Sequence, residues 1–182
     1  MTIKQPKDKT CKICREKFTP IRPLQSVCGF DCAIATAKKT REVKERKEHR
    51  EAKLKLKSRA DWLKEAQAIF NQYIRLRDEK ESCISCGRFH EGQYHAGHYR
   101  TVGANPELRF NELNVHKQCS ACNNYLSGNI IKYRQNLINK IGLQLVTWLE
   151  GPHEPAKLTI DDIKDIKALY KQKIKELNET QA

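Results

Sequence analysis

The sequence contains no long hydrophobic run. None of its apolar stretches approaches the roughly 18 residues that a membrane-spanning helix needs, and the N-terminal MTIKQPKDKT lacks the apolar core of a signal peptide. We therefore expect no membrane partner and a location in a reducing cytoplasm. Disulfides are rare in that compartment, so the eight cysteines are expected to have another role.

Acidic residues are the second shortage. The chain has 22 Asp and Glu against 35 Lys and Arg, which gives a formal net charge of +13 over 182 residues. Such an excess attracts a polyanion, and nucleic acid is the commonest one. Hydrophobic residues make up 38% of the chain, and small domains with little apolar material often gain stability from bound metals.

Glycine and proline are both absent from Ala33 to Lys80. Within this segment, Lys38 to Arg59 carries eleven Lys and Arg but only four Glu, several of them three or four residues apart. This spacing predicts a solvated helix, which is either a charged linker or a contact to the DNA backbone. Ser58 and Asp61 resemble a capping box, and the apolar residues from Trp62 onward predict a following amphipathic helix.

The cysteines fall into close pairs. The first two pairs, C-x2-C and C-x3-C, lie near the N-terminus on either side of a proline-containing loop. Four thiolates so close together suit one tetrahedral zinc, and the segment is too short to bury a core, so zinc would be its main source of stability. The predicted ligands of this structural zinc are Cys11, Cys14, Cys28 and Cys32.

A second zinc-knuckle pattern lies in the middle of the chain. Cys83 and Cys86 are followed by Gly87, which permits the tight turn that points backbone amides at thiolate sulfurs. Thirty-two residues separate this pair from Cys119 and Cys122, which complete a C-x2-C…C-x2-C arrangement. We expect a second structural zinc here.

The residues between these two pairs carry the candidate chemistry. Residues 94–100 read as a short strand that contains His95 and His98, and a loop follows. Asn114 then precedes Cys119 by five positions, and Asn123 directly follows the last cysteine. This order resembles the HNH nuclease motif, in which the first histidine ends a strand, the asparagine lies on the returning strand and the third position lies on a helix.

The HNH resemblance implies metal-dependent hydrolysis of DNA phosphodiesters. His98 would be the general base, because histidine has an unperturbed pKa near neutrality. Asn114 would orient the His98 ring by accepting a hydrogen bond, and Asn123 would be a ligand of a catalytic divalent cation, Mg²⁺ or Mn²⁺. The chain would then be an endonuclease that carries two structural zinc ions and one catalytic cation.

One position departs from the HNH pattern. Many HNH nucleases place a metal ligand directly before the catalytic histidine, where this chain has Gly97. His95 lies on the same strand face as Gly97 and is the first candidate for the replacement, with His116 as another possibility. A structural or DNA-contacting histidine is the alternative interpretation of His95.

Two arginines flank the loop inside the motif. Either Arg100 or Arg109 could hold the scissile phosphate, since a guanidinium binds phosphate bidentately. The sequence offers no reason to choose between them, and each is equally compatible with a surface arginine.

The C-terminal third is predicted to be helical. A helix over 130–141 should end at Gly142, followed by the segment 143–150 with Val146, Trp148 and Leu149 buried. GPHEP should form a turn, and Thr159 should open a last helix with one apolar face.

Three phrases extend the resemblance to nearly the whole chain. CKICREKFTP, HAGHYRTVGANPELRF and VTWLEGPHEP resemble the lambdoid phage NinG (Rap) family. That family comprises recombination endonucleases that cut branched DNA, which implies D-loops and Holliday junctions as substrates, phage or host recombination proteins as further partners, and the host cytoplasm as the location. Cutting a junction with two nicks would be easier for a homodimer.

The expected fold is α+β, with four segments. Residues 1–37 form a four-cysteine zinc module, 38–80 the basic and amphipathic helices, 81–130 a zinc-stabilised ββα-metal core of the HNH type, and 131–182 the C-terminal helices. The alternative function is a non-catalytic, zinc-dependent nucleic-acid-binding protein or recombination scaffold, because zinc pairs and a basic helix require no catalysis.

Overall fold

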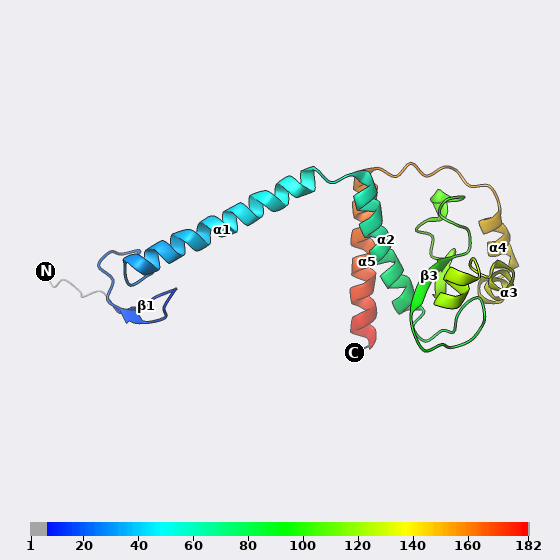
Figure 1. Cartoon of the computed structure of the whole chain (residues 1–182), viewed down its shortest axis with the longest axis horizontal. Coiled ribbons are helices and arrows are strands. Elements are labelled where there is room, and N and C mark those ends of the chain that lie inside the picture. The colour runs from blue at the N-terminus through cyan, green and yellow to red at the C-terminus, as the bar shows by residue number, and fades with distance from the viewer. Residues whose placement is uncertain (1–6, 182) are drawn as a thin grey trace. The chain divides into compact units, whose positions relative to one another are not determined.

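The computed structural model describes residues 7–181 and contains two compact units, which divide between Lys57 and Ser58 (Figure 1). This boundary falls inside the predicted 38–80 segment, whose two helices therefore belong to different units. The elements are helical apart from two small antiparallel sheets, so the α+β class is confirmed. No helix among the described residues is long and apolar enough to cross a bilayer.

The N-terminal unit consists of a short hairpin and one long helix. β1 (Lys9–Thr10) pairs antiparallel with β2 (Lys17–Phe18), and α1 spans Phe30–Lys55. No residue of α1 is buried, and its side chains form ion pairs four residues apart, such as Arg41 with Glu45. The predicted solvated helix is confirmed and begins earlier than the charge run.

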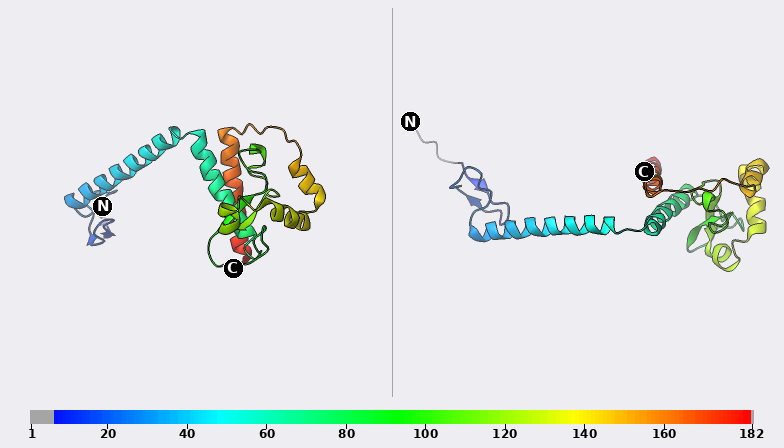
Figure 2. Two further views of the ribbon diagram at one scale, coloured as in Figure 1. Left: turned by 45° about the vertical axis from the view of Figure 1, so that its right-hand side comes forward. Right: turned by 90° about the horizontal axis from the view of Figure 1, so that it is seen from above.

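In the second unit, α2 (Arg59–Arg77) and α5 (Ile160–Gln181) lie side by side (Figures 1 and 2). The predicted capping box opens α2: the Ser58 side chain accepts from the backbone N–H of Asp61, whose carboxylate accepts from the N–H of Ser58. The two helices share an aromatic core, in which the Phe70 and Tyr170 rings meet edge to face with centroids 4.7 Å apart.

A two-stranded sheet lies at the centre of the second unit. β3 (Tyr94–His98) pairs antiparallel with β4 (Val115–Cys119), with Gly97 opposite His116. The loop between them contains η1 (Pro106–Leu108), and η2, a single π-helical turn over Ala121–Tyr125, follows β4. The predicted order of strand, returning strand and short helix is therefore present.

Helices α3 (Ile130–Ile141) and α4 (Leu143–Glu150) complete the second unit, with Gly142 between them as predicted. They build a second apolar core together with the loop that follows β3 and with the segment beside Cys83, and its buried members are Ile84, Tyr99, Leu108, Tyr133, Leu137, Val146 and Leu149. The predicted burial of Trp148 is wrong: this side chain is 48% exposed and packs against the His153 ring, because α4 turns its other face to the core.

Candidate functional site

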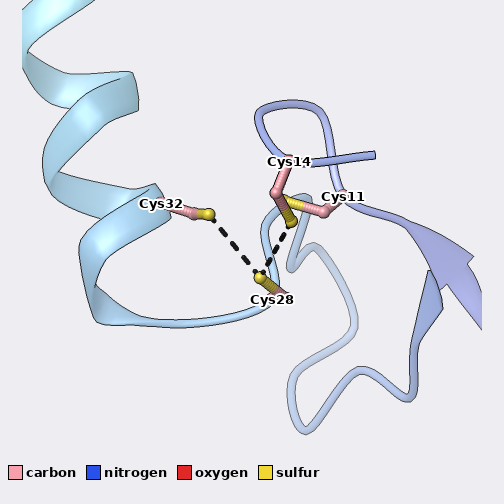
Figure 3. A group of neighbouring side chains, drawn as sticks. All are labelled: Cys11, Cys14, Cys28 and Cys32. Atoms are coloured by element: carbon pink, nitrogen blue, oxygen red, sulfur yellow. Dashed lines mark hydrogen bonds between the residues drawn. The ribbon is translucent and has the colours of Figure 1, made fainter. Parts of the chain in front are cut away.

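The first cysteine quartet gathers around one point, as Figure 3 shows. The Cys14 and Cys28 sulfurs are 3.5 Å apart, and those of Cys28 and Cys32 are 3.6 Å apart. Zinc–sulfur bonds of about 2.3 Å in a tetrahedron require sulfur–sulfur separations of about 3.8 Å, whereas a disulfide requires about 2.05 Å. The quartet therefore has the dimensions of a zinc site.

The second quartet, Cys83, Cys86, Cys119 and Cys122, is more deeply buried. The Cys119 amide donates to the Cys83 sulfur at 3.4 Å, and backbone amides outweigh the burial that would otherwise raise the pKa of Cys83, so its pKa is lowered. Gly87 has φ +68° and its amide donates to the Cys83 carbonyl, which is the tight turn predicted from its position. Thiolates held in this way suit a structural metal.

Both knuckles use the same turn. Arg15, the residue after Cys14, also has a positive φ of 63°, and its amide donates to the Cys11 carbonyl. Among residues 7–181, the two quartets are the only groups of three or more His, Cys, Asp or Glu side chains whose ligand atoms lie close enough to share a metal ion. Both predicted ligand sets are therefore brought together.

His98 lines a pocket of about 370 Å³ together with Asn123, Gln118 and the 127–128 turn after η2. Its Nε2 lies 3.0 Å from the carbonyl oxygen of Arg109. A carbonyl only accepts, so Nε2 carries the proton and Nδ1 is left with a free lone pair. Burial lowers the pKa of His98; the carbonyl bond opposes this shift, and the nearby Arg109 charge adds to it. The ring is thus a neutral base at pH 7.

The Asn114 side chain is completely buried and its hydrogen bonds go to the backbone. Its Oδ1 accepts from the Arg100 amide at 2.8 Å, and its Nδ2 donates to the carbonyls of Arg100 and Leu108. The prediction that Asn114 binds the His98 ring is wrong in this respect, because the Arg109 carbonyl holds the ring. Asn114 instead fixes the loop that carries this carbonyl.

Comparison with known proteins relates almost the whole chain to a single family. A family model described as "Bacteriophage Lambda NinG protein" matches residues 3–180. The chain belongs to the NinG family. "Protein ninG" of Escherichia phage 933W is 41% identical over 196 aligned residues, which cover 98% of each chain. "Protein ninG" of Escherichia phage lambda is 40% identical, and the alignment covers 98% of this chain and 97% of the lambda protein. "Protein ninG" of Salmonella phage P22 is also 40% identical, and the alignment covers 93% of this chain and 92% of the P22 protein. No solved structure matches the chain.

In this NinG chain, neither of the other two candidate histidines lines the His98 pocket. His95 Nε2 lies 2.9 Å from the hydroxyl of Ser120, and alternation along β3 places His95 and His98 on opposite faces. His116 is buried, and burial lowers its pKa to about 3; its ring contacts the Tyr133 hydroxyl. Both predicted substitutes for a side chain at position 97 are thus bonded elsewhere.

The two candidate arginines of the NinG chain also lie outside the lining of the His98 pocket. Arg100 donates from Nε to Asn105 at 3.2 Å, and Arg109 reaches Gln67 of α2 at 3.4 Å. The choice of a phosphate-binding arginine therefore stays open. Asn123, by contrast, is brought to the pocket: its Nδ2 donates to the Asn124 side chain, which leaves its Oδ1 as an acceptor.

The sequence did not single out Gln118, although the structure places it in the pocket. This side chain is 1% exposed and comes from β4, three residues after Val115. The signal that could have found it is a polar residue in the middle of a strand that is buried at every position.

Proposed function

We propose that this NinG chain is a metal-dependent DNA endonuclease that acts on branched recombination intermediates, with His98 as the general base. The observation that carries the proposal is the hydrogen bond from His98 Nε2 to the Arg109 carbonyl, which leaves Nδ1 as the unprotonated nitrogen of a neutral ring. A base in this state can take a proton from a water molecule that attacks a phosphodiester.

Asn114 supports this role from a distance. Its bonds to Arg100 and Leu108 fix both ends of the loop that delivers the Arg109 carbonyl. The loop therefore sets the tautomer and the orientation of the His98 ring, as the partner of a catalytic histidine does in other hydrolytic sites.

A divalent cation fits the pocket in a limited way. The Asn123 amide oxygen is a hard donor of the kind that Mg²⁺ and Mn²⁺ prefer, but no carboxylate lines the pocket. When bound, such a cation stabilises the negative charge that develops on a scissile phosphate and its leaving oxygen. Because Asn123 is neutral, the substrate phosphate would supply the charge that holds it.

DNA binding is supported by the charge of the chain and by α1. Every residue of α1 is at least partly exposed, and the helix carries most of the Lys- and Arg-rich run. Two units that both carry positive charge can contact two duplex arms, which raises the effective concentration only where both arms are within reach, as at a junction.

The test is cleavage of a four-way junction, a D-loop and a linear duplex of equal length, with Mg²⁺, Mn²⁺ or EDTA. We expect cleavage of the branched substrates with either cation and none with EDTA. Equal cutting of the linear duplex would reject the selectivity and leave a general endonuclease.

A non-catalytic zinc-dependent binding protein is the second candidate function. It is favoured by the two cysteine quartets and the solvated basic helix, none of which requires chemistry. Tight binding to the four-way junction, without cleavage in Mg²⁺, Mn²⁺ or EDTA, would select this candidate.

A further inference from the structure

Residues 19–25, the loop that follows β2 in the first unit, expose two large apolar side chains. Ile21 is 91% exposed and Leu24 is 95% exposed, the highest fractions among the large hydrophobic residues of the described part of the chain. A single exposed apolar residue is common on protein surfaces, but two within four residues forgo the stabilisation that burial of both would give. We call these two side chains the apolar tip, and the fold itself gains little from them.

The loop that carries the apolar tip is braced. The Gln25 side chain accepts a hydrogen bond from the Ile21 amide at 2.8 Å, and Lys9 Nζ donates to the Pro23 carbonyl at 2.9 Å. Pro20, the second proline of the loop, is buried, and each proline ring fixes one backbone angle. The loop therefore presents the tip in an ordered conformation, which lowers the entropy cost of binding a partner.

Cations lie beside the apolar tip. A hollow of about 390 Å³ is lined by Lys7, Lys9, Pro20, Ile21, Arg22 and Pro23. Half of these residues are cations and none is acidic, so the surface fits a partner that covers an apolar side chain and supplies negative charge next to it. DNA meets both requirements where an apolar side chain inserts between base pairs, because phosphates flank the opened step.

A branch point is the part of a DNA molecule that suits such an insertion best. Insertion into a continuous duplex costs unstacking energy, and this cost is smaller where the stack is already interrupted. We propose that the apolar tip enters the base stack at the branch point, with Lys7 and Arg22 on the flanking phosphates. The inference rests on the proposed function and deepens it, because it assigns recognition of the branch to the first unit.

A second copy of the chain is the less favoured occupant of the tip, because two such surfaces would bring like charges together. Two double variants separate these possibilities. Ile21→Ser with Leu24→Ser removes the tip. Val43→Ser with Leu56→Ser is the matched control, because it also changes two exposed apolar residues of the first unit. Neither pair alters the charge, so the electrostatic attraction for DNA is the same in both.

The experiment uses the zinc-loaded full chain and a four-way junction with 2-aminopurine either at the branch point or in the middle of one arm, without Mg²⁺ or Mn²⁺. The fluorescence of 2-aminopurine rises when the base loses its stacked neighbours. Wild type should raise the branch-point signal and leave the arm signal unchanged. The tip variant should give no rise and should bind the junction about tenfold more weakly, with unchanged affinity for a linear duplex. The control pair should behave as wild type.

Three results would overturn the inference: no branch-point rise with wild type, a rise that persists in the tip variant, or equal loss of affinity for junction and linear duplex. A tip variant that loses self-association in sedimentation but keeps the fluorescence rise would make the tip an interface between copies. Zinc content and thermal unfolding verify that each variant is folded. Failure of the proposed function looks different: the branch-point rise would depend on the tip while no substrate is cut with Mg²⁺ or Mn²⁺.

Discussion

The two units differ in how their charge and their cores are distributed. Residues 1–57 contain 17 Lys and Arg against 7 Asp and Glu, whereas residues 58–182 contain 18 against 15. The first unit has a long helix with no buried residue, and the second has two apolar cores around a sheet. Most of the attraction for a polyanion therefore resides in the first unit, and the only candidate catalytic pocket identified in the described residues resides in the second.

The two cysteine quartets differ in burial, as the two units do. In the first, Cys14 is exposed and Cys28 and Cys32 are partly exposed, whereas in the second Cys83, Cys119 and Cys122 are buried. The first unit has almost no apolar core to hold its hairpin, so metal binding and folding should be a single event there. In the second unit the metal adds to stability that packing already provides.

The largest expected effect separates the two quartets. Cys28→Ser should remove one of two zinc ions and unfold β1 and β2. Binding of a structural zinc contributes about 10–16 kcal/mol in small zinc peptides, which exceeds the whole free energy of unfolding of many domains. The unfolding transition of the second unit should not move. Elemental analysis gives the zinc content, and amide hydrogen exchange reports each unit separately.

The counterpart is Cys83→Ser, which should also cost one zinc but should lower the unfolding temperature of the second unit without abolishing its fold. Protected hairpin amides in a Cys28→Ser protein that has lost one of its two zinc ions would contradict the comparison. Fewer than two zinc ions in fully folded wild type would contradict both quartets.

A smaller effect separates binding from chemistry. His98→Ala should lower cleavage by about 10²–10⁴, the usual contribution of a general base, while junction affinity stays near that of the wild type because phosphate contacts dominate it. Because the pKa of His98 is lowered, the neutral base persists below pH 6.5. In a plot of kcat/KM against pH, kcat/KM should therefore rise with pH on the acidic side, with a midpoint below pH 6.5.

Cleavage and binding are measured on the same junction at one salt concentration. Full activity in folded His98→Ala would remove the base assignment, and a parallel loss of binding would mean that the side chain only supports the fold. An acidic limb centred above pH 6.5 would contradict the buried, neutral ring.

Local spacing made part of this site predictable. A tetrahedral metal collects ligands from tight turns, so the C-x2-C pairs and Gly87 could be recognised in the sequence. Helix starts were equally local: Ser58 and Asp61 lie three residues apart and cap each other. The order of β3, β4 and η2 around His98 followed from the motif.

The interactions that the sequence did not reveal are those made across the fold. The Arg109 carbonyl is a backbone group, which leaves no trace in residue identity, and it reaches His98 only because the loop folds back. Gln118 faces Gly97 diagonally across a strand pair whose register is fixed by tertiary packing. His95 shares a strand with His98 but not a face of it, so proximity in sequence was misleading.

The smallest expected effect concerns the charge of the first unit. Arg46→Gln with Lys53→Gln on α1 should weaken binding to junctions and duplexes of every sequence alike and flatten the slope of log K against log salt, by about 0.9 for each duplex phosphate that the variant no longer neutralises. The matched control, Lys171→Gln with Lys175→Gln on α5, removes the same charge from exposed positions of the second unit. If α1 lies along DNA, only the first pair changes the slope, because counterions are released where cations meet phosphates and not by net charge alone. Equal slopes for both pairs would make α1 a solvated spacer, and the excess charge of residues 1–57 would then steer DNA to the protein without touching it.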